Sequence, residues 1–196
     1  IAARFDVKGY PTLFIFHAGG TKRSPYKGPR DENGIVDYMK AMARSPSQLV
    51  TSREQLRKQL REDVPTIVGL FDRSTQDFSP QFDLFLDAAY DQFDATNHFV
   101  HVEKREIVEQ LKREPNTLLL YKPLLLRNKY EPNLHSLSLN ESITLEQILA
   151  FIANHSVPLV GYRNGATYSL YADKYPLVVV YFDVDFSFDH RKRKFT

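Results

Sequence analysis

The stretch Lys8-Gly9-Tyr10-Pro11-Thr12-Leu13-Phe14-Ile15-Phe16 runs from a turn, through an X-Pro bond, directly into apolar and aromatic residues. We predict a strand over residues 12–17, because a proline at the first residue of a strand removes no ladder hydrogen bond. A trans Tyr10-Pro11 bond is the commoner choice, but cis costs only about 0.5–1 kcal/mol before proline. A cis bond would turn the backbone of Tyr10 outward, where its N–H and C=O could pair with an extended peptide.

The residues after this strand predict a hairpin and a helix. Gly19-Gly20 favours a hairpin turn, and a second strand is expected over residues 24–27. Gly28-Pro29-Arg30-Asp31 then leads into a helix whose apolar residues follow one buried stripe: Ile35, Val36, Met39, Met42 and Ala43. Ser45-Pro46-Ser47 is rich in turn-forming residues and indicates a boundary between this segment and the next.

Residues 48–156 alternate between strand and helix patterns. Strands are expected at residues 49–50, 66–71, 98–102 and 117–121, with residues 124–130 completing a hairpin with the last of these. Helices are expected after Ser52, after Ser79-Pro80, over residues 106–112 and after Thr144, with capping boxes pairing Ser52 with Gln55 and Thr144 with Gln147.

The pattern then repeats. Residues 64–72 recur as residues 175–183, and Leu49-Val50 recurs as Leu159-Val160, at a spacing of about 110 residues. A second register aligns residues 11–16 with residues 116–121. Because this spacing is one domain length, we expect a tandem array of α/β domains whose first copy lacks its front and whose last copy lacks its back two-thirds. The chain therefore reads as a fragment.

Arg4-Phe5-Asp6-Val7-Lys8-Gly9-Tyr10-Pro11-Thr12, followed by Tyr26-Lys27-Gly28-Pro29-Arg30, resembles the back half of a catalytic a-type domain of the protein disulfide isomerase family. The order β-α-β-α-β-α-β-β-α is the thioredoxin-like one, a mixed sheet between helices. Lys129-Tyr130-Glu131-Pro132 and Val184-Asp185-Phe186-Ser187-Phe188-Asp189 look most like a large member with three a-type domains.

The resemblance implies an α/β fold of tandem thioredoxin-like domains, with the first and last truncated. Residues 1–43 would be the C-terminal half of a catalytic a-type domain. Residues 48–156 would be a redox-inactive b-type domain, and residues 157–196 the start of a b′-type domain. Asn116 stands where the b-type copy would carry the proline, so this domain is expected to be a spacer and binding surface.

The family exchanges thiols and disulfides of secretory proteins in the endoplasmic reticulum lumen, with a C-x-x-C pair in each a-type domain. This chain has no cysteine, so we expect it to be inactive alone. On the resemblance, Pro11 is the cis-proline that faces the absent dithiol, and Tyr10, Pro11 and Thr12 hold a substrate strand. Arg30 would lower the pKa of the second cysteine, since a nearby guanidinium favours the thiolate.

The implied partners are unfolded or misfolded secretory proteins with disulfides, and other chaperones of the same compartment. The alternative is a redox-inactive thioredoxin-like chaperone or scaffold that binds unfolded chains or partner proteins. No cofactor is expected. A net charge of +2 gives no reason to expect a nucleic-acid partner, and no apolar run approaches the ~18 residues of a membrane helix.

Three other patterns in the sequence have both a structural and a functional interpretation. His98 and His101 are three apart on a predicted strand, so they point to opposite faces and cannot share a metal. The aromatic stripe Phe82, Phe85, Tyr90 and Phe93 favours a core over a cofactor pocket. The basic run at residues 190–194 favours a solvated helix face over a phosphate site.

Overall fold

The computed structural model describes residues 5, 7–17, 20, 22–26, 28–73, 80–92, 97–165, 167–171 and 176–181. The chain divides into two compact units, Ile1–Gly161 and Tyr162–Thr196. Within the described ranges, no helix has the length and apolar character needed to cross a membrane.

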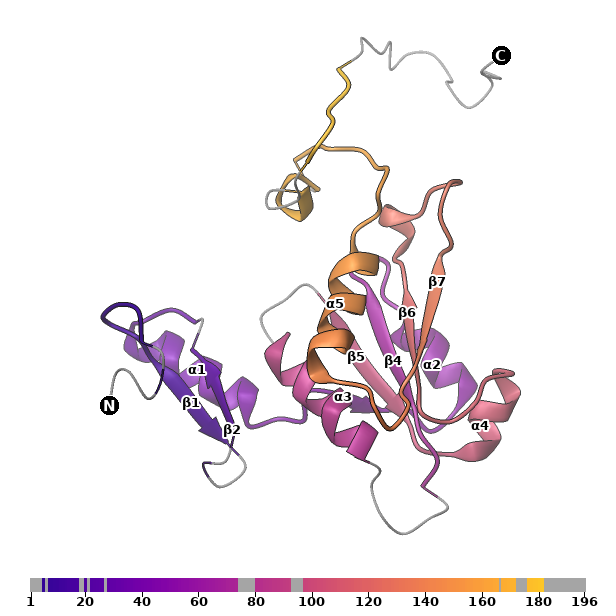
Figure 1. Cartoon of the computed structure of the whole chain (residues 1–196), viewed down its shortest axis with the longest axis horizontal. Coiled ribbons are helices and arrows are strands. Elements are labelled where there is room, and N and C mark those ends of the chain that lie inside the picture. The colour runs from indigo at the N-terminus through magenta and orange to yellow at the C-terminus, as the bar shows by residue number, and fades with distance from the viewer. Residues whose placement is uncertain are drawn as a thin grey trace. The chain divides into compact units, whose positions relative to one another are not determined.

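A five-stranded mixed sheet forms the centre of the first unit (Figure 1). Its strands, in spatial order, are β3 (Gln48–Leu49), β5 (His98–Val102), β4 (Thr66–Leu70), β6 (Thr117–Tyr121) and β7 (Leu134–Ser138). β3 and β4 run parallel to β5, whereas β6 is antiparallel to both β4 and β7. This confirms the mixed sheet expected from the order of elements.

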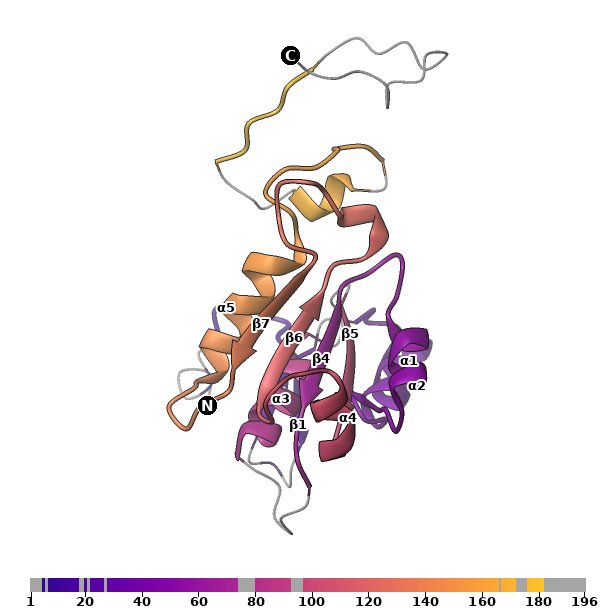
Figure 2. The same ribbon diagram turned by 90° about the vertical axis from the view of Figure 1, so that its right-hand side faces the viewer.

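Helices cover both faces of this sheet (Figures 1 and 2). One face packs against α3 (Pro80–Asp91) and α5 (Leu145–Ser156), and the other against α2 (Arg53–Gln59) and α4 (Arg105–Gln110). Successive residues of a strand point to opposite faces. Ile67 and Phe99 therefore join the α3/α5 core, while Val68 and Val100 join the α2/α4 core. The aromatic side chains Phe82 and Phe85 are buried in the first core, as predicted; Phe93 lies outside the described residues.

The two predicted capping boxes differ. At α5, Thr144 Oγ1 accepts a hydrogen bond from Gln147 N, and the Gln147 side chain accepts from Thr144 N, which confirms the box. At α2, Ser52 Oγ accepts from Gln55 N, but Gln55 Oε1 accepts from Thr51 N and Oγ1. The second half of that prediction is wrong, because Thr51 offers both an N–H and a hydroxyl to the Gln55 side chain.

The predicted strand over residues 124–130 is also wrong. Leu124–Leu126 form a 3-10 turn, η3, after Pro123, and the hairpin partner of β6 is β7. The side chain of Asn128 explains the change, because its Oδ1 accepts from the N–H groups of Tyr130 and Glu131 and closes a turn. The chain therefore enters its last strand later than predicted.

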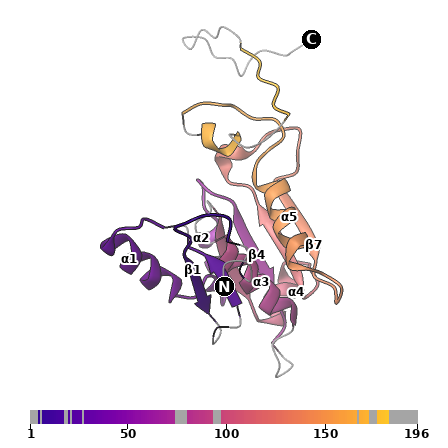
Figure 3. The ribbon, with the colours of Figure 1, turned by 60° about the vertical axis from the view of Figure 1, so that its left-hand side comes forward.

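At the N-terminus, β1 (Phe14–His17) and β2 (Lys22–Pro25) form an antiparallel hairpin followed by α1 (Glu32–Met42) (Figure 3). The strand–hairpin–helix order confirms the prediction, although β2 begins two residues earlier than expected. Gly20, in the hairpin loop, has a φ of 87°, a conformation that favours glycine. Asp31 caps α1 by accepting a hydrogen bond from Gly34 N.

The predicted buried face of α1 is largely exposed. Ile35, Val36 and Met39 are 39–43% exposed, Ala43 is exposed, and only Met42 of the predicted stripe is buried. The apolar stripe is present, but in the described part of the chain the adjoining hairpin offers only two strands to cover it. The predicted helix is confirmed, and the predicted burial of its apolar stripe is wrong.

The described residues of the third segment form no strand; residues 175 and 182–183 of the predicted recurrence lie outside the described residues. Leu159 and Val160 make no ladder and are 86% and 53% exposed. In the second unit, the described residues 176–181 are exposed and unpaired, and the short 3-10 helix η4 (Tyr168–Tyr171) precedes them. A strand needs a neighbour for its N–H and C=O groups, and the described residues provide none here.

Candidate functional site

The loop predicted to hold substrate lies before β1. Its Tyr10-Pro11 bond is cis, as the family resemblance implied. Tyr10 is 85% exposed, and Pro11 and Thr12 are exposed as well. Thr12 Oγ1 donates to Gly9 O and closes the turn. The loop therefore presents Tyr10 to solvent at the entrance to the hairpin.

Arg30 lies at the exposed start of α1, next to the capping residue Asp31. The preceding turn is closed by Tyr26, whose hydroxyl donates to Pro29 O and whose ring packs edge-on against Tyr38. Among the described residues, no hydrogen bond or ion pair joins Arg30 to the Tyr10 loop. Arg30 and the Tyr10 loop are both exposed, and the role predicted for Arg30 stays a prediction.

In the central sheet, Asn116 occupies the position aligned with Pro11. Its φ is 53°, in the left-handed region that asparagine tolerates and that the proline ring forbids. Its carbonyl accepts a hydrogen bond from Leu139 N. The backbone just before β6 therefore excludes a proline at this position, whether or not cysteines lie nearby.

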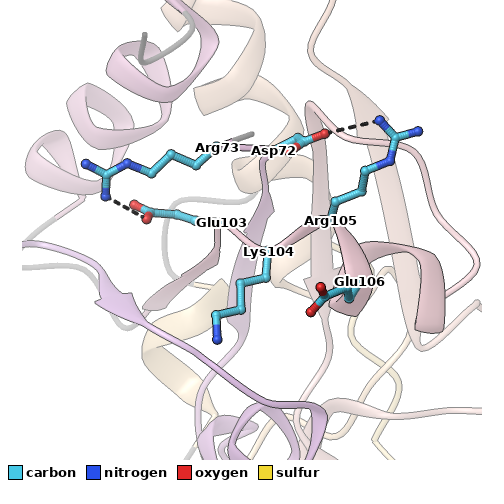
Figure 4. Close-up of a pocket in the computed structure, with 6 residues that line it drawn as sticks. All are labelled: Asp72, Arg73, Glu103, Lys104, Arg105 and Glu106. Atoms are coloured by element: carbon cyan, nitrogen blue, oxygen red, sulfur yellow. Dashed lines mark hydrogen bonds and ion pairs between the residues drawn. The ribbon is translucent and has the colours of Figure 1, made fainter. Parts of the chain in front are cut away.

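A charged pocket of about 490 Å³ opens where β4 and β5 end (Figure 4). Because these strands are parallel, their carboxyl ends meet at one edge of the sheet. β4 leads into Asp72 and Arg73, and β5 leads into Glu103, Lys104, Arg105 and Glu106. The sequence analysis did not predict this pocket. It could have been predicted from two neighbouring parallel strands that are each followed by charged residues.

Two ion pairs lie at the pocket, and each joins a residue that follows β4 to a residue that follows β5. Arg73 Nη1 lies 3.1 Å from Glu103 Oε2, and Arg105 Nη1 lies 3.4 Å from Asp72 Oδ2. Both carboxylates are largely buried, while both guanidinium groups are more than half exposed. The pocket thus presents charges of both signs, with the positive groups further out.

His101 contacts Glu103, and His98 lies on the opposite face of the sheet. Its Nε2 is 3.5 Å from Glu103 Oε1, and its Nδ1 is 2.8 Å from Ser47 Oγ. Burial lowers the pKa of His101, and the Glu103 carboxylate opposes this only in part. His98 points to the other face, where its Nε2 meets Gln59 Oε1. Across the described residues, no three metal-ligating side chains come together.

A second polar cluster, also missed from the sequence, surrounds Glu131 in the β6–β7 loop. Lys122 is only 1% exposed, and its Nζ lies 2.6 Å from Glu131 Oε2. Glu131 Oε1 accepts from Asn128 Nδ2 and from the N–H groups of Leu159 and Val160. Burial works to raise the pKa of Glu131, but these hydrogen bonds and the Lys122 charge lower it to about 2. The cluster ties the segment after α5 to this loop.

These features can be compared with known proteins. A family model described as a thioredoxin-like domain matches residues 75–195. Protein disulfide-isomerase A4 of Bos taurus is 38% identical over 97% of this chain, and the probable protein disulfide-isomerase A4 of Caenorhabditis elegans is 30% identical over 98%. The chain spans 29% and 30% of the lengths of these two relatives.

Comparison with solved structures gives the same result as comparison of sequences. The bb fragment of ERp72 superposes with a TM-score of 0.58 at 33% identity, over 76% of this chain and 63% of that one. Human ERp44, form II, superposes with a TM-score of 0.57 at 21% identity, over 81% of this chain and 40% of that one, and shows the shared fold. With the mixed sheet and its two helical layers, these matches establish that the chain belongs to the thioredoxin-like domain family.

Proposed function

We propose that this chain is part of a protein disulfide isomerase of the A4 type, which catalyses thiol–disulfide exchange and assists the folding of secretory proteins in the endoplasmic reticulum lumen. The similarity to A4 relatives along 97% of the chain carries the proposal. Exchange begins when a thiolate attacks a disulfide sulfur. This chain has no cysteine, so in this proposal the dithiol comes from residues outside it and the chain alone is inactive.

Residues 1–43 would then supply the peptide-holding side of one redox site. Tyr10, Pro11 and Thr12 would contact an extended substrate strand, a role supported by their exposure. Arg30 would approach the dithiol and favour the thiolate of its second cysteine. Its exposed position at the start of α1 supports this role.

Residues 48–156 would serve as a redox-inactive b-type domain, and residues 157–196 as the start of a b′-type domain. The left-handed backbone of Asn116 supports the absence of redox chemistry in the central domain. The second candidate function, a chaperone or scaffold module for unfolded chains or partner proteins, is favoured by the exposed apolar side chains of the β6–β7 loop, Leu124, Leu125 and Tyr130.

The test compares this chain with a version extended upstream by one half-domain, in insulin reduction and in refolding of scrambled ribonuclease. We expect activity only in the extended chain. There, Arg30→Gln should lower the rate and move its pH profile, while Arg57→Gln, an exposed change on α2, should leave both unchanged. If neither chain is active in these assays and both still bind unfolded peptide, the proposed enzyme function is wrong and the scaffold function takes its place.

A further inference from the structure

Two stretches of the chain carry the Asn-x-Ser pattern of N-glycosylation acceptors, Asn140-Glu141-Ser142 and Asn154-His155-Ser156. A three-residue pattern of this kind is weak by itself. The structure separates the two stretches, because they lie in different backbone environments.

Asn140 lies in the loop between β7 and α5, and Asn140, Glu141 and Ser142 are all exposed. Asn140 Oδ1 accepts hydrogen bonds from Ser142 Oγ at 3.0 Å and from Ser142 N at 3.1 Å. Among the described residues, Asn140 Nδ2 donates no hydrogen bond. The Ser142 hydroxyl thus polarises the amide through its oxygen, which favours loss of a proton from the free Nδ2.

Asn154 lies inside α5, close to its end. Helical residues two apart do not face each other, so the Ser156 hydroxyl cannot reach the Asn154 amide while the helix is formed. Ser156 is buried, and its Oγ donates to Asn97 Oδ1 at 3.3 Å. The second stretch therefore lacks both the turn of the first and its hydrogen bond from the serine hydroxyl to the asparagine amide.

We propose that Asn140 is an N-glycosylation site and that Asn154 is not. In the transfer, Asn140 Nδ2 forms a bond to C1 of an oligosaccharide carried on a lipid pyrophosphate. The C1–oxygen bond to the pyrophosphate breaks, the pyrophosphate leaves with the electron pair, and the amide proton passes to a base of the transferase. The inference rests on the proposed location in the secretory lumen, where this donor and enzyme act.

The fold accommodates a glycan at this position. Asn140 is exposed, and its contact with the domain is made by its backbone carbonyl, which accepts from Gln81 Nε2. β7 ends at the same sheet edge as β4, because Ser138 pairs with Thr117 and Thr117 pairs with Leu70. The glycan would therefore project into solvent at the edge that carries the charged pocket, on the β7 side.

The acceptor test uses the full chain behind a cleavable secretory signal, translated with endoplasmic-reticulum microsomes. We expect one glycan, seen as a single mobility step that endoglycosidase H removes. Asn140→Gln and Ser142→Ala should abolish the step, Ser142→Thr should keep it, and the matched Asn154→Gln should leave it unchanged. An unshifted chain that still accepts a glycan at an appended control site, or loss of the step in Asn154→Gln, overturns the proposal.

Analysis of the native full-length protein tests the glycosylation site and the proposed location separately. We expect the lumenal protein to be endoglycosidase-sensitive in the peptide that contains Asn140. A protein that is protected inside the lumen but unmodified there overturns the glycosylation site alone. A protein found outside the lumen overturns the proposed location, on which this inference depends.

Discussion

Lys122 and Glu131 form a buried ion pair that no pattern in the sequence reveals. Lysine is rarely fully buried without a partner, yet Lys122 is 1% exposed, with Glu131 at 2.6 Å. The pair is nine residues apart in a loop without periodicity, so no sequence pattern identifies it. Only the folded loop, closed by Asn128, brings the two charges together and removes them from water.

Glu131→Gln should be more destabilising than removal of both charges. The substitution leaves the buried Lys122 ammonium unpaired, so we expect the free energy of unfolding to fall by about 3–5 kcal/mol. The double variant Lys122→Met/Glu131→Leu should cost less than this. Urea unfolding of both, with the exposed Glu114→Gln as control, measures the difference. A double variant at least as destabilised as Glu131→Gln would contradict the argument.

The Lys122–Glu131 pair also makes the stability of the fold depend on pH under acidic conditions. The folded-state pKa of Glu131, about 2, is below the ordinary 4.5. Its contribution to stability is therefore complete above about pH 4.5 and is lost as the pH falls toward 2.

Gly69 in β4 lies where a side chain has no room. A Cβ at this position would lie 2.5 Å from Phe71 Cε2 and 3.1 Å from Phe85 Cε2. We expect Gly69→Ala to lower the free energy of unfolding by about 1–3 kcal/mol, since overpacking displaces both rings. Gly165→Ala is the control, because no atom beyond the adjoining residues lies within 4 Å of its Cβ position. Equal unfolding midpoints for the two variants would show that the rings move freely.

Among the strands, β5 divides its two histidines between the faces of the sheet, as its period of two required. Both His98 and His101 have their pKa lowered mainly by burial. The neutral form is thus favoured in the folded state, so the contribution of each group is complete above about pH 6.5 and declines as the pH falls through its folded pKa.

We therefore expect the wild-type chain to be less stable at pH 5.5 than at pH 7.5. His101→Gln should reduce this loss without abolishing it, because His98 and His155 also have lowered pKa values. Urea unfolding at the two pH values measures the loss in each protein. An unchanged difference in His101→Gln would mean that protonation of His101 does not destabilise the domain.

Predictions of helices and strands succeeded where the pattern was local. Thr144 and Gln147 identified the start of α5, and the buried run at residues 66–71 identified β4, because capping and burial leave a signature in neighbouring residues. The partner of β6 was misplaced, because pairing depends on where the chain returns. The side-chain bonds of Asn128 delayed that return to Leu134.

For the chain as a whole, we expect one cooperative core over residues 48–156 with less protected flanks. β4 has a strand on each side and helices on both faces, whereas in the described part of the chain β1 pairs with β2 alone. Native-state hydrogen exchange should therefore be much slower in Thr66–Leu70 than in Phe14–His17. Equal protection of the two strands would contradict this.

The division of residues 1–43, 48–156 and 157–196 into three domains stays a prediction, as do the roles of Tyr10, Pro11, Thr12 and Arg30. The sequence alone determined the order of elements, the thioredoxin-like class and the resemblance to disulfide isomerases, because these depend on short motifs and on the periodicity of apolar residues. The charged pocket, the Lys122–Glu131 pair and the exposed face of α1 depend on which distant segments meet. Burial and pairing are properties of the packed chain, so only the tertiary structure decided them.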